Sequence, residues 1–298
     1  LQIANEKIIE EGQVECNDIS ELFYLAWCCY ENSKYKKGID IVKKINPESS
    51  NDRRQKYDIL GRCYLALDDY KKSLKYFQLW LEDELNKNDD DDDDKDIKKK
   101  RIAYIHSSKG KVFFYLKRYE EALQCYDEAL EIEDNIHYII NKCEVLNKLK
   151  RYNESLELSN RAEEIDNSLV SIYLYKAEAM FHLGYYSEAM QCCDISMDIF
   201  PYFKDIFILK EKIYNKCNKY EEVLEIVKQC EKLEIKDDEI LLYKAIALMN
   251  SDKFDEGYEI LRNLKESDND DVRCQAYYEI AIIEYDKDKY NEALRDVN

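Results

Sequence analysis

Aromatic residues recur along the chain at a nearly constant spacing. Successive members lie 35, 49, 33, 34, 34, 34 and 36 residues apart. These anchor residues are Tyr35, Tyr70, Tyr119, Tyr152, Tyr186, Tyr220, Phe254 and Tyr290. A period of about 34 residues is the length of one helix-turn-helix unit, and such a period decides the architecture of a whole chain. The sequence therefore predicts an array of antiparallel helix pairs.

Small side chains form two columns at fixed offsets from the anchors. Nine residues before the anchors stand Ala26, Gly61, Gly110, Cys143, Ala177, Glu211, Ala245 and Ala281. Three residues after them stand Gly38, Ser73, Ala122, Ser155, Ala189, Val223, Gly257 and Ala293. Small residues allow two helix backbones to approach closely, so the columns predict where the helices of a unit touch. Glu211 and Val223 depart from the pattern.

These columns resemble the tetratricopeptide repeat, as in residues 57–64 followed by Tyr70, or residues 183–189 around Tyr186. The resemblance covers roughly residues 20–298, in about eight tandem units. It implies an all-α fold, a right-handed α-solenoid (superhelix) of tandem antiparallel helix pairs. The composition agrees, because 6 Gly and 2 Pro in 298 residues leave little material for sheets with glycine-rich turns.

The expected organisation is one array in which each unit touches mainly its neighbours. Residues 1–19 are expected to be a leftover or capping helix of a preceding repeat, and residues 20–85 the first two units. Residues 86–101 are an expected insertion loop, and residues 102–298 carry units three to eight, the last one truncated. Both ends are expected to be cut within the array.

The one long interval, 49 residues, locates an insertion that holds the aspartate run 89–94 and the basic cluster 98–101. Six consecutive aspartates repel one another, which predicts a mobile, solvated loop around residues 86–95. A lure for a basic partner is the alternative. A calcium site is disfavoured because the alternating oxygens and the glycine of an EF-hand loop are missing. The basic cluster is expected to form local charge pairs or the first turn of a helix.

Charge and cysteine usage exclude several classes of function. A formal net charge of −19 disfavours nucleic acid, whose phosphates need clustered Lys and Arg. No run of about 18 apolar residues is present, so membrane insertion is not expected. The 11 cysteines contain no C-x-x-C pair and are expected to be free core thiols of an intracellular, cytoplasmic protein.

Catalytic and metal-binding motifs are absent from the sequence. There is no phosphate-binding glycine loop, no nucleophile elbow and no H-E-x-x-H. His106, His137 and His182 are spread over three units without ligand spacing. We therefore predict that the chain is not an enzyme and needs no metal or cofactor.

In the tetratricopeptide family, the first helix of each unit lines a concave groove that holds a peptide or helix. The corresponding positions lie twelve, eleven, eight and five residues before the anchors. The candidate partner-binding residues are Asn141, Tyr175, Glu178, Phe181, Leu209, Lys212, Tyr243, Ile246 and Met249. Tyr175, Phe181, Tyr243 and Met249 are favoured because aromatic and methionine side chains give adaptable contact area. Packing against the next repeat is the alternative role for the aliphatic residues twelve before each anchor.

Lysines form another column, ten residues before five of the anchors. Its members are Lys109, Lys142, Lys176, Lys210 and Lys244. Their stems are expected to pack between helices while the amines reach water, a structural role. The Lys, Asn and Arg pattern by which some tetratricopeptide co-chaperones grip a C-terminal carboxylate is not matched.

The sequence thus favours a non-catalytic protein-protein interaction scaffold that binds a partner peptide or amphipathic helix in the concave groove, as part of a larger complex. The alternative is a regulatory or substrate-recognition domain of a larger enzyme or peptide-sensing regulator, with the active part outside this chain. The convex face is a second surface that could bind a partner. Self-association through uncapped ends is a further prediction.

Overall fold

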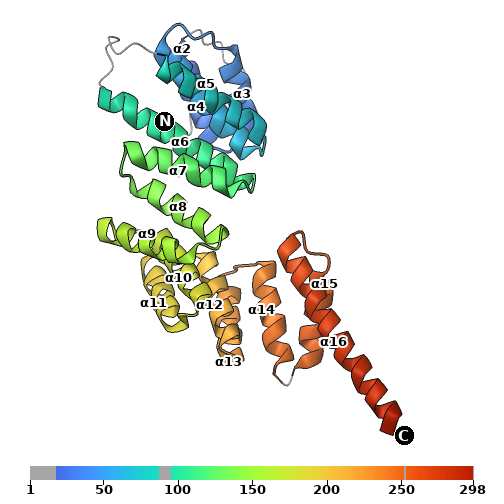
Figure 1. The fold of residues 1–298 in the computed structure, drawn as a ribbon. Coiled ribbons are helices and arrows are strands. Elements are labelled where there is room, and N and C mark those ends of the chain that lie inside the picture. The colour runs from blue at the N-terminus through green and yellow to red at the C-terminus, as the bar shows by residue number, and fades with distance from the viewer. Residues whose placement is uncertain (1–17, 87–94, 252, 298) are drawn as a thin grey trace. The chain divides into compact units, whose positions relative to one another are not determined.

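The computed structural model describes residues 18–86, 95–251 and 253–297, with side chains described up to residue 285. This part of the chain holds 15 helices and no strand, which confirms the all-α class (Figure 1). It divides into two compact units, residues 1–151 and 152–298. The helix predicted at residues 1–19 and the aspartate run 89–94 lie almost entirely outside the described residues.

In unit 1 each helix packs against its neighbours in sequence, and first helices also touch, α2 with α4 and α6 with α8. Local capping explains several helix starts: the Asp18 carboxylate accepts from Ser20 N–H, and Ser49 and Asp52 form a reciprocal capping box. The helices are α2 Ile19–Glu31, α3 Tyr35–Lys44, α4 Ser50–Ala66, α5 Tyr70–Leu85, α6 Lys95–Tyr115, α7 Tyr119–Ile132 and α8 Ile136–Lys148.

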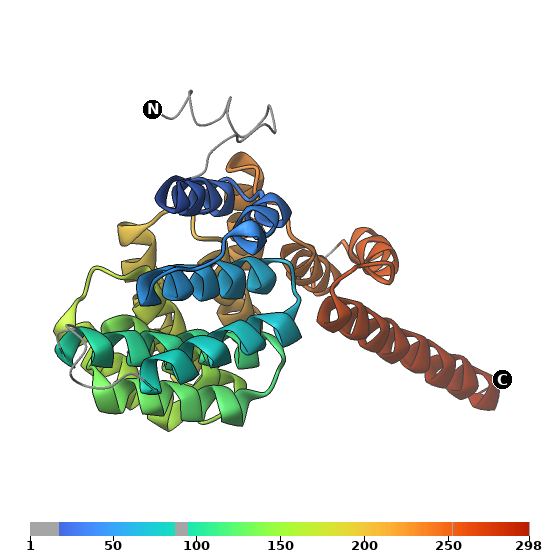
Figure 2. The ribbon, with the colours of Figure 1, turned by 90° about the horizontal axis from the view of Figure 1, so that it is seen from above.

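Unit 2 repeats the arrangement, and its first helices α10, α12, α14 and α16 contact one another in succession. Figures 1 and 2 show that the long α16 extends beyond α15. The helices are α9 Tyr152–Ile165, α10 Val170–Leu183, α11 Tyr186–Ile199, α12 Lys204–Lys216, α13 Tyr220–Lys232, α14 Asp238–Met249, α15 Phe254–Leu264 and α16 Asp270–Val297.

Seven of the eight aromatic anchors are the first residue of a second helix, from Tyr35 in α3 to Phe254 in α15. Six of the preceding turns, those before Tyr35 to Tyr220, share one geometry, shown by Lys117, whose φ is 59°. Its N–H donates to Phe114 C=O, and the next N–H, that of Arg118, donates to Phe113 C=O, both at 2.9 Å. This is a Schellman ending, in which a left-handed residue satisfies the last carbonyls of a helix. The residues with positive φ at this position are Ser33, Asp68, Lys117, Lys150, Gly184 and Asn218.

The small columns are buried from Ala26 to Gly257, whereas Ala281 of the last repeat is exposed. The buried members explain the close packing within repeats. A Cβ built on Gly61 would lie 2.7 Å from the Phe77 ring, so α4 and α5 meet at a distance only glycine allows. Ser73 fits the same contact because its hydroxyl donates to Gly61 C=O at 2.8 Å. Ala26, Ala177, Ala189 and Ala245 are all 0 % exposed.

The insertion is shorter than expected, because α6 begins at Lys95 and takes residues 95–101 of the predicted loop. A buried ion pair explains this start. Glu84, 0 % exposed, lies between Arg54 of α4 at 2.8 Å and Arg101 at 3.2 Å, and it accepts from Trp80 Nε1. The last residue of the basic cluster thus ties α6 to α4 and α5.

The last predicted unit is wrong in its secondary structure: α16 continues through Tyr290, where a turn and second helix were expected. A turn at Asp288 would need a left-handed residue and would break two or more helical hydrogen bonds. That cost is offset only by packing of a second helix. Residues 291–297 contain Ala293, Leu294 and Val297 as their apolar residues, and α16 continues through them.

The described cysteines are free, and seven of the ten are buried. Burial raises the pKa of Cys63 and of Cys193 to about 12, so both stay protonated, unreactive thiols at neutral pH. They fill core positions, as the sequence indicates. None of the described helices combines the length and the apolar character needed to cross a membrane.

The turn geometry predicts opposite effects of two substitutions. Lys117→Gly should raise the free energy of unfolding by about 0.5–1 kcal/mol, and Gly184→Ala should lower it by about 1 kcal/mol, because only glycine adopts positive φ without strain. No atom lies within 4 Å of a Cβ built on Gly184, so its backbone alone is tested. Urea denaturation followed by circular dichroism measures both, and equal signs would contradict the assignment.

The buried ion pair predicts a large effect at Glu84. Glu84→Ala should lower the free energy of unfolding by about 3–5 kcal/mol, because two largely buried arginines lose their shared counter-charge. Glu82→Ala, on the exposed side of the same helix, is the matched control and should change stability by less than about 0.5 kcal/mol. Chemical denaturation of both variants decides the matter; comparable losses would contradict a special role for Glu84.

Candidate functional site

The predicted partner-binding positions in unit 2 lie on three first helices that touch in succession. Tyr175, Glu178 and Phe181 lie on α10, Lys212 on α12, and Tyr243 on α14; all five are partly buried. Lys212 Nζ pairs with Glu239 Oε1 of α14 at 2.7 Å. These residues therefore occupy one continuous wall of unit 2, with aromatic and charged side chains that keep some surface.

Packing removes Leu209 from this set and limits two others. Leu209 is 5 % exposed and belongs to the core cluster around Tyr173 and Ala177, so it has no surface for a partner. Ile246 and Met249 pack partly against the core between α14 and α16. The side chains of Leu209, Ile246 and Met249 therefore pack between neighbouring repeats.

Asn141 is the one candidate in unit 1. It lies on α8 and is partly buried, next to the buried residues Ile140 and Cys143. Its position on the first helix agrees with the sequence register. Contact between Asn141 and a partner stays a prediction.

Glu211 of α12 is an anomaly beneath this wall. It is 0 % exposed, and neither carboxylate oxygen has a hydrogen-bond partner. Burial, reinforced by the negative charges of Glu239 and Asp237, raises the pKa of Glu211 to about 9. The carboxyl group is therefore protonated at neutral pH. The sequence marked this residue as out of place in a small column but did not indicate its protonation.

In unit 1 the corresponding face is filled by a cluster that the sequence analysis missed. The Arg62 guanidinium carbon lies 5.2 Å from the ring centres of both Trp27 and Tyr104, which come from α2 and α6. Arg62 Nε donates to Asp58 Oδ1 at 2.7 Å, and Tyr104 Oη donates to the same oxygen at 3.3 Å. Burial raises the pKa of Asp58, although Arg62 and Tyr104 oppose the shift.

This cluster joins three first helices through cation-π and ionic contacts, each of which gains strength when partly desolvated. The available signal was the occurrence of Trp27 and Arg62 at the same register position, eight residues before their anchors. That signal did not reveal the cluster because the partners come from different units.

The lysine column makes ion pairs and does not simply reach water. Each of four lysines contacts a carboxylate on the second helix of the preceding repeat. The distance is 2.8 Å both from Lys210 to Asp194 and from Lys244 to Glu231. Lys109 differs, because its Nζ donates to the neutral Gln78 Oε1 at 3.1 Å. The remaining pairs are Lys142 with Asp127 and Lys176 with Glu163.

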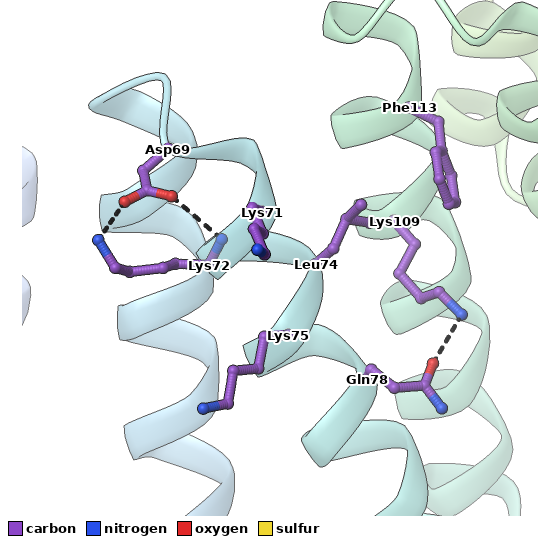
Figure 3. Close-up of a pocket in the computed structure, with 8 residues that line it drawn as sticks. All are labelled: Asp69, Lys71, Lys72, Leu74, Lys75, Gln78, Lys109 and Phe113. Atoms are coloured by element: carbon purple, nitrogen blue, oxygen red, sulfur yellow. Dashed lines mark hydrogen bonds and ion pairs between the residues drawn. The ribbon is translucent and has the colours of Figure 1, made fainter.

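Lys109 and Gln78 line a depression of about 770 Å³ between α5 and α6 of unit 1 (Figure 3). Leu74 points toward α6 and Phe113 lies on α6, so the two form its apolar part. Its complete lining is Asp69, Lys71, Lys72, Leu74, Lys75, Gln78, Lys109 and Phe113. Four lysines against one aspartate make this a basic site on an acidic chain.

Two family models match the chain. A model of the tetratricopeptide repeat matches residues 103–135, and the model described as anaphase-promoting complex, cyclosome, subunit 3 matches residues 5–78. The first match spans most of α6 and all of α7, a pair that contains the anchor Tyr119 and the small residues Gly110 and Ala122. The chain therefore carries tetratricopeptide-type repeats.

Solved structures of tetratricopeptide repeat proteins share this fold. One from Parabacteroides merdae has a TM-score of 0.66 and 12% identity, covering 87% of this chain and 96% of its own. TTC0263 of Thermus thermophilus has a TM-score of 0.53 and 18% identity, covering 60% and 99%. MamA (residues 41 to the end) from Desulfovibrio magneticus has 0.51 and 16%, covering 62% and 97%. A search of curated proteins finds no match.

The described part of the chain contains no group of three or more His, Cys, Asp or Glu side chains placed to hold a metal ion. The geometry described here instead offers two kinds of surface: a wall of first helices in unit 2 and a lysine-lined depression in unit 1.

The raised pKa of Glu211 predicts a pH-dependent stability. Below pH 4.5 the carboxyl group is protonated whether the chain is folded or unfolded. Between 4.5 and about 9 only the unfolded chain releases the proton, so the free energy of unfolding falls by about 1.4 kcal/mol per pH unit. Glu211→Ala restores the small residue of the column and removes this dependence.

Urea denaturation at pH 5.5 and pH 7.5 measures the effect. The wild-type protein should lose about 3 kcal/mol more than Glu211→Ala over this range. The exposed Glu221→Ala, at the start of α13, should behave as wild type. Equal pH slopes for wild type and Glu211→Ala would show that the Glu211 carboxyl has an ordinary pKa.

Proposed function

We propose that this chain is a non-catalytic interaction scaffold that holds a peptide or amphipathic helix of a partner protein within a larger complex. The observation that carries the proposal is the wall of first helices in unit 2. There, partly exposed aromatic side chains of α10 and α14 flank the Lys212–Glu239 ion pair of α12 and α14. Tyr175, Phe181 and Tyr243 supply the aromatic surface.

The chemistry of this wall suits an amphipathic segment. Aromatic side chains bury large areas at a low cost in conformational entropy, and they are enriched where partner proteins bind. Glu178 and Lys212 offer charges of both signs that fix the register of a bound segment. The segment would lay its apolar face along α10, α12 and α14.

The core supports this interpretation over catalysis. The buried carboxyl of Glu211 is protonated at neutral pH and has no hydrogen-bond partner, so it is not available as a general base there. The buried free thiols support the expected cytoplasmic, reducing location.

A double substitution tests the wall. Tyr175→Ala with Tyr243→Ala removes two aromatic rings from α10 and α14, and should reduce recovery of at least one partner about tenfold in affinity capture from a native lysate. Quantitative mass spectrometry measures recovery, and circular dichroism checks that helical content is kept.

The matched control removes two exposed rings elsewhere in unit 2. Tyr185 and Tyr202, 52 % and 62 % exposed, lie in loops beside α11; Tyr185→Ala with Tyr202→Ala should keep every partner. Retention of all partners by the Tyr175, Tyr243 variant would refute the proposed wall, and so would an equal loss in the control.

A further inference from the structure

The basic depression in unit 1 is out of character with the rest of the chain. The chain carries 64 acidic and 45 basic residues, yet lysines outnumber carboxylates four to one in this lining. The basic surface extends to α3, since Lys43 Nζ lies 5.7 Å from the centre of the Tyr64 ring, which Lys72 Nζ also approaches at 5.1 Å. A cluster of exposed lysines raises the local concentration of anionic ligands.

The lysine column shows that this charge is specific to one place. In four repeats the lysine ten residues before the anchor forms an ion pair with a carboxylate of the preceding second helix. At Lys109 the equivalent partner is the Gln78 amide, whose Nε2 donates in turn to Glu82 Oε1 at 3.0 Å. Lys109 thus keeps the contact with the preceding second helix, but its partner is a neutral amide. The carboxylate of Glu82 binds Gln78 and not the ammonium group of Lys109.

The four lysines of the depression are not equally available. Lys72 pairs with Asp69 and lies over the Tyr64 ring, so its charge is already used. Lys71 and Lys75 are exposed, and among the described residues neither ammonium group makes a hydrogen bond or ion pair. Figure 3 shows Lys75 on one side of α5, and Leu74 with Gln78 on the side that faces Lys109.

An apolar surface lies between these charges. Leu74 and Phe113 are partly exposed in the depression, and Arg118 covers the Phe113 ring from 4.8 Å. Free phosphate or another small anion would use only the lysines. A peptide that carries both carboxylates and an apolar side chain would use the charges and the apolar surface together.

We propose that the depression between α5 and α6 binds a short acidic peptide segment of a partner protein, which crosses α5 with carboxylates at Lys71, Lys75 and Lys109 and an apolar side chain on Leu74 and Phe113. Lys71 and Lys75 are one helical turn apart, about 6 Å. Carboxylates two residues apart in an extended segment have a similar spacing, about 6–7 Å.

A short peptide fits this site better than a nucleic acid strand. The favourable charge is confined to a few residues of α5 and α6, while the whole chain carries −19. A strand that continues past the depression meets repulsion, whereas a peptide with two or three carboxylates stays within it. This site deepens the proposed scaffold function by giving the chemistry of one partner segment, but it lies in unit 1 and is tested independently of the Tyr175 and Tyr243 variant.

The test uses the full chain and a fluorescein-labelled nonapeptide of alternating aspartate and leucine, with fluorescence anisotropy as the readout. Binding should weaken about tenfold in Lys71→Gln with Lys75→Gln, since two exposed charge contacts are lost. Gln78→Glu should weaken it severalfold, because it gives Lys109 the carboxylate that the other lysines of the column have. The second variant is expected to fold normally, as four equivalent pairs are already present.

Lys228→Gln with Lys232→Gln is the matched control: it removes two exposed lysines one turn apart from another second helix, α13, and should bind as wild type. A peptide of alternating aspartate and serine should bind more weakly, because it lacks the apolar contact. The proposal would be overturned if that peptide or single-stranded oligothymidine bound as tightly as the aspartate-leucine peptide. Wild-type affinity in both Lys71→Gln with Lys75→Gln and Gln78→Glu would also overturn it. If sizing chromatography showed a dimer of this chain that Lys71→Gln with Lys75→Gln abolished, the depression would bind a second copy of the chain and not a partner protein.

Discussion

The close approach of paired helices at the small-residue columns is the constraint on which each unit depends. Where Gly61 faces the Phe77 ring, even a methyl group would lie 2.7 Å from it, so the helix separation is fixed by the residue with no side chain. The bulky anchors and core residues then fill the volume around that contact. The Schellman turns serve the same contact, because they end each first helix at the point from which the second can return against it.

The repeat period predicted the helix pairs well because it reports a local property that recurs. Tyr35, Tyr70 and Tyr119 could be placed at helix starts because each follows the same short turn and the same small columns. The continuous α16 could not be predicted this way. Asp288 has the same register as Asp68, and the choice between turn and helix depends on whether a second helix gains enough packing.

The candidate site was predicted in register but not in exposure. Tyr175 and Leu209 hold equivalent positions in neighbouring repeats, yet Leu209 is buried in the core cluster that α12 forms with α10 and α11. The Arg62 cluster and the change from carboxylate to amide at Gln78 also escaped prediction. Both depend on pairs of side chains from different helices, and one sequence gives the columns separately without showing which members meet.

Two buried glutamates show how differently the same residue can be accommodated. Glu84 is charged in a setting that supplies two arginines and an indole N–H, so it joins three helices. Glu211 has no such partners and gives up its charge instead. A buried carboxyl group stabilises a repeat array only when its counter-charges are built in with it.

The sandwich of Arg62 between Trp27 and Tyr104 has a consequence for competition at unit 1. The guanidinium already occupies the aromatic faces that an incoming cationic side chain would seek, and Asp58 already holds its counter-ion. A ligand on this face must therefore exchange contacts with Arg62 and cannot simply add to them, so its net gain there is small. On the face formed by α2, α4 and α6, the side chains of this cluster already satisfy one another.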